Sequence, residues 1–248
     1  MLNGRPTCSL FVFLHTPATG GRSLLATIRQ SRRLSCISTD KTRRLPESDA
    51  CRPGIDRWRY GISAFTNASF VAGRHLFIEY EGFHTLKRVL NTFNRDIRPT
   101  YEGRLGCKLI TGSLFREPIR QAQAHWRHFG DPRNHELAHK NTSFIDHALR
   151  VVRSQHQTFG TCLRSEDCYR NLDWIGVTDE WRRSLCMLSS LLRVRLGDDL
   201  FVTDTTNVPR TQATAEERQR VEQLEQHVVP TFGAQLREFE RRATHSGC

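Results

Sequence analysis

The 248-residue sequence has no run of 18 apolar residues, the length a membrane-spanning helix needs. Its first apolar stretch is too short for a secretory signal and lacks a small-residue cleavage site. Zinc-finger, RNA-recognition and basic-zipper signatures are also missing, and the aromatic residues do not alternate with the basic runs. We therefore expect no spanning helix and no nucleic-acid partner.

Acidic residues are in the minority. The chain has 26 Asp and Glu against 37 Lys and Arg, which gives a formal net charge of +11. Such a surplus attracts polyanions, a class that includes acidic polysaccharides and acidic membranes. A merely solvated basic surface is the alternative.

Six of the eight cysteines are scattered without the spacing of metal ligands. Cys162 and Cys168 lie close together, and the residues between them are mostly polar. A disulfide there would close a small loop and would require an oxidising compartment. Two free thiols are the alternative.

Short apolar runs alternate with helical patterns along the chain. They predict strands at 9–14, 69–80, 107–115 and 172–178. The intervening patterns predict helices at 23–32, 84–95, 117–129, 142–157, 179–195, 214–227 and 231–243, and the polar segment 33–60 indicates a loop or insertion. The sequence thus predicts one α/β domain over 1–248, with a central parallel sheet flanked by helices and a helical C-terminal portion at 200–248.

A glycine-containing loop follows the first predicted strand. Gly20 and Gly21 allow a tight turn that points N–H groups inward, and the next helix adds a partial positive charge. Thr19, Arg22 and Ser23 supply further donors. The loop lacks the lysine of a Walker A sequence. We predict that these five residues bind phosphate; an ordinary strand-to-helix turn is the alternative.

Arg116 directly follows the predicted strand 107–115. Ligands of open α/β sheets bind at the carboxyl ends of the strands, and a guanidinium there suits a second phosphate. An ion pair with Glu117 or with a helix carboxylate is the alternative. With the glycine loop, this arrangement predicts a sheet of the P-loop nucleotide-binding type.

These features together resemble the sulfotransferases that use 3′-phosphoadenosine 5′-phosphosulfate (PAPS). The family's loop P-K-T-G-G-T/R-S is similar to PATGGRS at 17–23, and its 3′-phosphate motif R-D/E-P is similar to REP at 116–118. The segment IGVTDE at 175–180 is similar to its V-G-V-T-E. The resemblance spans roughly residues 9–200. It is nearest to carbohydrate enzymes of the uronyl and heparan sulfate 2-O-sulfotransferase type, whose Gly-His segment and short disulfide loop are similar to 70–80 and 162–168.

The resemblance implies that a sulfo group passes from PAPS to a hydroxyl of an acidic glycan. Thr19–Ser23 would hold the 5′-phosphosulfate and Arg116 the 3′-phosphate. A histidine suits the general base; His75 is the first candidate and His84 the reserve, and Arg22 is a third catalytic candidate. The resemblance also implies the Golgi lumen, with membrane attachment only through an N-terminal segment absent from this sequence. A soluble form is the alternative.

Two positions depart from the family pattern. Ala18 stands where the family has the loop lysine, and Ala124 stands where it has the 3′-phosphate serine. Losing one such donor lowers the rate by about 10²–10³. A catalytically degenerate, sulfotransferase-like binding protein is therefore an alternative function.

A second motif has a different meaning. His135-Glu136-Leu137-Ala138-His139 matches H-E-x-x-H, in which two histidines one helical turn apart bind zinc and the glutamate is the base of a metalloprotease. Its surroundings are polar, and no third ligand follows at the usual spacing. A zinc metalloprotease is thus a further alternative, and we expect no metal site.

Overall fold

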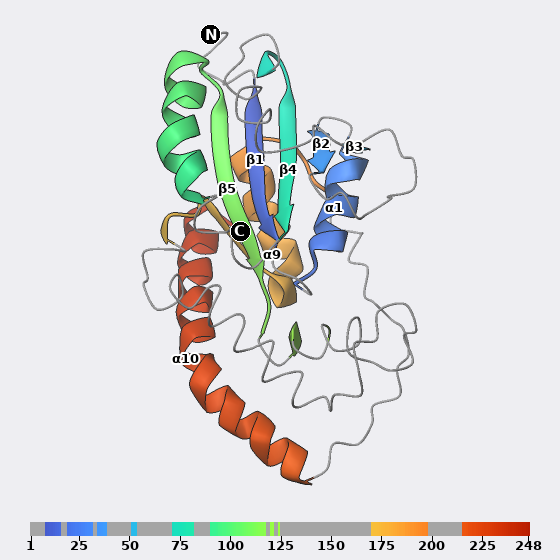
Figure 1. Ribbon diagram of the computed structural model, residues 1–248, viewed down its shortest axis with the longest axis vertical. Helices are drawn as coiled ribbons and strands as arrows, with labels where there is room; N and C mark the ends of the chain where they lie inside the picture. Colours follow the sequence, from blue (N-terminus) through green and yellow to red (C-terminus); the bar gives the residue numbers. More distant parts are fainter. Residues whose placement is uncertain are drawn as a thin grey trace.

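The computed structural model describes residues 8–15, 19–31, 34–38, 51–53, 71–81, 90–117, 120–121, 124, 170–197 and 215–248. Its six described strands form one parallel sheet in the order β3-β2-β4-β1-β5-β6 (Figure 1). The strands are β1 (Ser9–His15), β2 (Leu34–Ser38), β3 (Cys51–Pro53), β4 (His75–Glu81), β5 (Lys108–Phe115) and β6 (Trp174–Val177). The predicted α/β class with a central parallel sheet is confirmed.

Strand β1 lies in the middle of the sheet, between β4 and β5. All seven of its residues are buried, because helices cover both faces of a parallel sheet. A strand in this position therefore needs a continuous apolar run. Aromatic rings fill one face: the Phe11 ring centroid lies 5.4 Å from that of Phe77 and 5.7 Å from that of Trp174. This packed centre fixes the position of the β1 carboxyl end.

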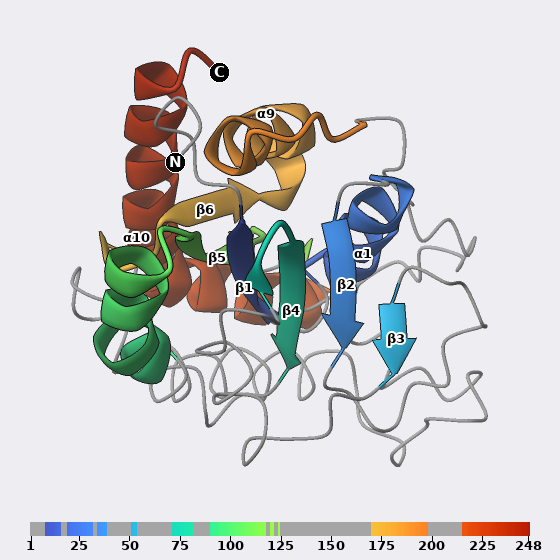
Figure 2. The same ribbon diagram turned by 90° about the horizontal axis from the view of Figure 1, so that it is seen from above.

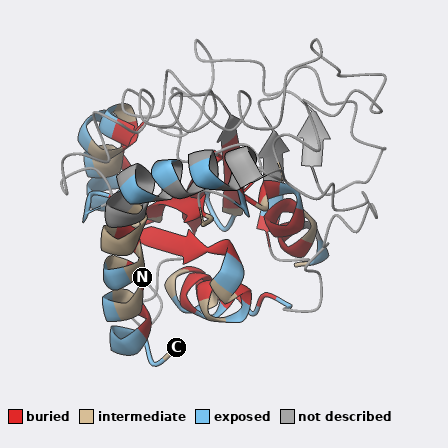
Figure 3. Cartoon of the chain, turned by 90° about the horizontal axis from the view of Figure 1, so that it is seen from below, coloured by how far each residue is buried: buried red, intermediate tan, exposed pale blue. Residues whose placement is uncertain are grey.

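Helices cover the two faces of the sheet. Figure 2 places α1 (Gly21–Gln30) and α9 (Trp181–Leu192) on one side, and the π-helical segments η1 (Thr92–Ile97) and η2 (Pro99–Arg104), drawn in green, on the other. Figure 3 shows buried strands between the helices. The Arg98 Nη2 atom between η1 and η2 lies 2.5 Å from Asp173 Oδ2, just before β6. This contact holds the η1–η2 segment against the sheet.

The C-terminal portion is helical, as predicted, but it is one helix rather than two. Helix α10 runs unbroken over Ala215–His245, through Pro230. The prediction of separate helices at 214–227 and 231–243 was wrong, because a proline inside a helix removes one hydrogen bond and bends the helix without always ending it. Figure 1 shows that α10 changes direction along its length.

The last turns of α10 are fastened to α9. Phe239 and Ala243 are fully buried, and Arg183 donates two hydrogen bonds, of 2.8 and 2.7 Å, to the Glu240 carboxylate. A disulfide joins Cys186 of α9 to Cys248. The last turns of α10 are therefore anchored to α9, with Phe239 and Ala243 in the core.

The segment 33–60, which was predicted to be a loop or insertion, contains strands β2 and β3. A second disulfide, Cys8–Cys107, joins the amino ends of β1 and β5. The predicted helix 142–157 and the cysteines Cys162 and Cys168 lie outside the described residues. Among the described helices, none is long and apolar enough to cross a membrane.

Candidate functional site

The strand order creates a switch point at β1. After β1 the chain builds β2, β3 and β4 on one side of it, and then β5 and β6 on the other. Ligands of open α/β sheets bind outside the carboxyl ends at such a point. The pairing of Leu14 with Ser113 aligns the ends of β1 and β5, and the Ser113 hydroxyl donates a 2.7 Å hydrogen bond to Leu14 O. The structure thus brings the glycine loop and Arg116 to one edge, as predicted.

Gly20 directly precedes helix α1 as its N-cap and adopts the left-handed conformation, with φ 97°. Side chains rarely adopt this φ, so glycine suits the position. Its carbonyl accepts the first helical hydrogen bond, 3.1 Å from Leu24 N. Gly20 has no side chain to cap the helix, and the first turn carries no acidic residue. The N–H groups of this turn therefore keep their partial positive charge for an anion.

The side chains of the loop differ in exposure. Thr19 and Ser23 are buried, whereas Arg22 is exposed at the surface. The Ser23 carbonyl accepts a 3.0 Å hydrogen bond from the Thr27 hydroxyl, within α1. Arg22 is therefore the side chain of the loop that can reach a ligand from outside, while the backbone supplies the inner donors.

Thr178 links the loop to the neighbouring strand. Its buried hydroxyl, directly after β6, donates to Thr19 O and lies 3.0 Å from Phe115 O. One hydroxyl therefore holds the loop after β1 next to the carboxyl end of β5. In the sequence, Thr178 belongs to the segment 175–180, and no local pattern indicates its link to the loop.

Arg116 is half-buried directly after β5. The next residue, Glu117, accepts a 2.7 Å hydrogen bond from Arg120 N through its carboxylate. Asp179, two residues after the end of β6, pairs with Arg120 at 2.5 Å between Oδ1 and Nη1. The Glu117 carboxylate thus accepts from the backbone of Arg120, and the Asp179 carboxylate pairs with the guanidinium of Arg120.

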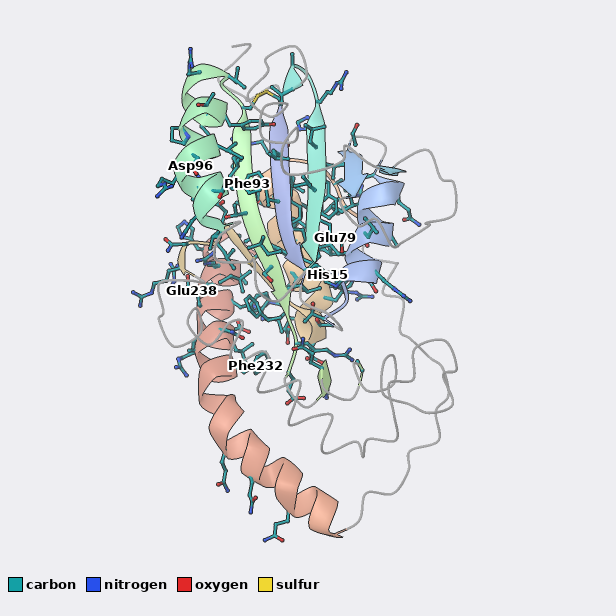
Figure 4. The ribbon with its side chains drawn as sticks, viewed as in Figure 1. His15, Glu79, Phe93, Asp96, Phe232 and Glu238 are labelled. Carbon is teal, nitrogen blue, oxygen red and sulfur yellow. A yellow bond between two sulfur atoms is a disulfide. The ribbon has the colours of Figure 1, made fainter. Side chains whose placement is uncertain are left out.

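A buried pair absent from the predicted site lies beneath the loop. His15 ends β1 and Glu79 lies on β4; they are 3% and 5% exposed, and 2.7 Å separates Nδ1 from Oε1. Figure 4 shows the two residues side by side near the carboxyl edge. The imidazole stacks on Phe13 with 5.5 Å between the ring centroids. A Cβ added to Gly21 would lie 2.2 Å from His15 Nε2, so the ring directly supports the loop backbone.

The structure places the first candidate base elsewhere. His75 begins β4 and pairs with Ser9 at the opposite edge of the sheet, where its Nδ1 lies 2.9 Å from the Ser9 hydroxyl. Strand β4 ends at Glu81, about 20 Å further along at 3.3 Å per residue. The structure therefore does not bring His75 together with Thr19–Ser23. His84 lies outside the described residues.

The H-E-x-x-H sequence at 135–139 also lies outside the described residues. Within the part of the chain that the structure describes, no group of three or more His, Cys, Asp or Glu side chains could hold a metal ion.

Comparison with solved structures gives a likeness, whereas comparison with families and curated sequences gives none. No protein-family profile matches the chain, and no curated protein matches its sequence. Among solved structures, the crystal structure of a sulfotransferase from Alicyclobacillus acidocaldarius aligns with 95% of this chain and 96% of that chain, at 15% identity and a TM-score of 0.49.

Proposed function

We propose that this protein transfers a sulfo group from PAPS to a hydroxyl of an acidic carbohydrate. The observation that carries the proposal is the pair of cationic features at one sheet edge. The uncapped start of α1 at Gly20 and the guanidinium of Arg116 stand at the carboxyl ends of two neighbouring strands. PAPS carries two separate anionic groups, and its recognition needs two such features. The motif resemblance at 17–23 and 116–118 supports the same assignment.

In this proposal the chain's own groups act on three parts of the reaction. The N–H groups of Gly21, Arg22 and Ser23 bind the 5′-phosphosulfate, and Arg116 binds the 3′-phosphate. The acceptor oxygen forms a bond to sulfur while the bond from sulfur to the phosphate oxygen breaks. The hydroxyl proton passes to a base, and 3′-phosphoadenosine 5′-phosphate (PAP) leaves. We assign the base to His84, which follows the end of β4 by three residues in the sequence.

The cell compartment and the acceptor class form part of the proposal. Two disulfides in the described residues suit an oxidising compartment, which agrees with the Golgi lumen implied by the resemblance. The formal charge of +11 favours an acidic acceptor over a neutral one.

The first experiment is calorimetric titration of PAP into the folded protein. We expect a dissociation constant in the micromolar range. The Arg116→Ala variant should weaken it about 10- to 100-fold, since a hydrogen-bonded charge pair is worth about 1.5–3 kcal/mol. Arg104→Ala removes the same charge from η2 and should bind PAP like the wild type. Absence of binding at millimolar PAP would refute the proposal.

The second experiment separates transfer from binding. The protein is incubated with PAPS and a panel of uronic-acid polysaccharides, and sulfated product is counted. Because Ala18 replaces the loop lysine, we expect slow turnover, which Ala18→Lys should raise by about 10²–10³. Tight PAP binding with no product from either protein would refute transfer and favour the degenerate binding protein.

A further inference from the structure

We propose that His15 and Glu79 form a positioning pair that fixes the backbone of the phosphate loop at Gly21. The proposal rests on the function proposed above, and it explains what sets the geometry of the N–H donors in the loop. Neither residue needs to touch the ligand, because the imidazole acts through the backbone that it contacts.

Strand register brings the two residues together. In the parallel pairing of β1 with β4, Phe13 is the partner of Glu79 and His15 is the partner of Glu81. Side chains alternate between the faces of a strand, so His15, Phe13 and Glu79 lie on the same face. The imidazole Nδ1 and the carboxylate Oε1 lie 2.7 Å apart, which makes a close, buried polar contact between the two side chains. This contact sets the orientation of the ring.

The opposite edge of the same ring meets the loop. A methyl group at Gly21 would lie 2.2 Å from Nε2 and 2.5 Å from both Cδ2 and Cε1 of His15. The φ of Gly21 is not in the left-handed region, unlike that of Gly20. An alanine at 21 is therefore excluded by the His15 ring and not by its own backbone. The contact is close enough that a tilt of the ring must move the first residue of α1.

Stability alone does not account for the pair. Replacing a buried ionisable pair by apolar side chains of similar volume is often neutral or stabilising, because the charged groups lose their hydration. Here a histidine and a glutamate occupy an aromatic core with Phe13 and Phe77, where their residues are only 3% and 5% exposed. The need to orient the His15 ring towards the loop explains why a histidine and a glutamate occupy this apolar core.

The test compares variants of His15, Glu79 and Gly21 by PAP affinity and by amide hydrogen exchange over residues 19–25. We expect His15→Ala and Glu79→Leu to weaken PAP binding about tenfold and to speed exchange in this segment. Glu79→Gln keeps an acceptor for Nδ1 and should bind within about threefold of the wild type. The matched control is Ser9→Ala, which removes the buried hydroxyl that lies 2.9 Å from His75 Nδ1 at the amino ends of β1 and β4, away from the loop. It should lower the unfolding midpoint and leave PAP affinity and loop exchange unchanged.

A double-mutant cycle tests the contact itself. Gly21→Ala should weaken PAP binding about 10- to 100-fold, the effect of overpacking a tight site. In the His15→Ala background the methyl group has room, so Gly21→Ala should add no further loss. A full additional loss in that background would overturn the proposal, as would wild-type affinity and exchange in His15→Ala. Hydrogen exchange needs no ligand, so it still decides the positioning role if PAP fails to bind and the proposed function falls.

Discussion

Replacing Thr178 by valine removes one buried hydroxyl and keeps the branched shape of the side chain. That hydroxyl donates to Thr19 O and lies 3.0 Å from Phe115 O. In the variant, these carbonyls lose the donor that joins the loop to β5. An unsatisfied buried acceptor costs about 1–3 kcal/mol. For a chain of this length the midpoint of thermal unfolding should fall by about 2–12 °C.

The same change should weaken PAP binding. Without the hydroxyl, the loop after β1 is no longer held to the end of β5, so binding must reorder it. We expect about a tenfold rise in the PAP dissociation constant, which corresponds to about 1.4 kcal/mol. Calorimetric titration at a temperature where both proteins are folded measures this rise separately from the loss of stability.

Thr27→Val is the matched control for Thr178→Val. Thr27 is equally buried, and its hydroxyl also donates to a backbone carbonyl, that of Ser23, at 3.0 Å. Ser23 O lies inside α1 and keeps its helical N–H partner, so the lost hydroxyl leaves no bare acceptor. We expect little change in stability or affinity. If Thr178→Val matched Thr27→Val in both measurements, the link between Thr178 and the loop would have no energetic importance.

Two further predictions concern the C-terminal helix. Cys248→Ser opens the 62-residue disulfide loop to Cys186 and should lower the free energy of unfolding, measured by urea denaturation, by about 4 kcal/mol. Reductant should abolish the difference between the two proteins. Equal stability of the two proteins in oxidising buffer would contradict the prediction. Hydrogen bonds from Arg241 and then Arg242 lower the pKa of Glu238 to about 2 from 4.5. Because the folded-state pKa is depressed, this stabilisation of about 3 kcal/mol is present above pH 4.5 and is lost as the pH falls towards 2. Glu238→Gln should flatten the unfolding free energy across that window, and an unchanged slope would refute the assignment.

The buried strands were predictable because their apolar runs are continuous. LFVFL and KLITGSLF correspond to β1 and β5, which are buried on both faces and tolerate few polar residues. Strands β2 and β3 were missed because five and three residues with polar neighbours carry no such pattern. Pairing with a neighbouring strand defines them, and pairing is not visible in a short polar segment.

The disulfides show the same limit. Spacing drew attention to Cys162 and Cys168, which are close in the sequence. The pairs that the structure describes, Cys8–Cys107 and Cys186–Cys248, are separated by 99 and 62 residues. They form because strand order places β5 beside β1 and because α10 packs on α9. Sequence distance gives no signal for either.

The candidate site divides in a similar way. The glycine loop and Arg116 were predictable, because each directly follows a buried strand and parallel strands end at one edge. The hydroxyl of Thr178 could not be assigned to the loop, since 159 residues separate it from Thr19. The loop and Arg116 directly follow their strands and leave a local pattern, whereas the Thr178 hydroxyl reaches the loop from a distant element and leaves none.

Histidines at the two ends of the β1–β4 pair show that position along a strand decides what a residue can do. His75 begins β4 beside Ser9, whereas His15 ends β1 beneath the loop. Both are histidines near hydrogen-bonding partners, and residue type alone favours neither. In a parallel sheet only the carboxyl ends meet the ligand edge, so a histidine that is the last residue of a strand has access to the loop and one that is the first has not. The sequence contained this signal, because His15 directly precedes the loop segment 16–23. Strand direction alone was sufficient to favour His15 over His75 as the histidine at the ligand edge.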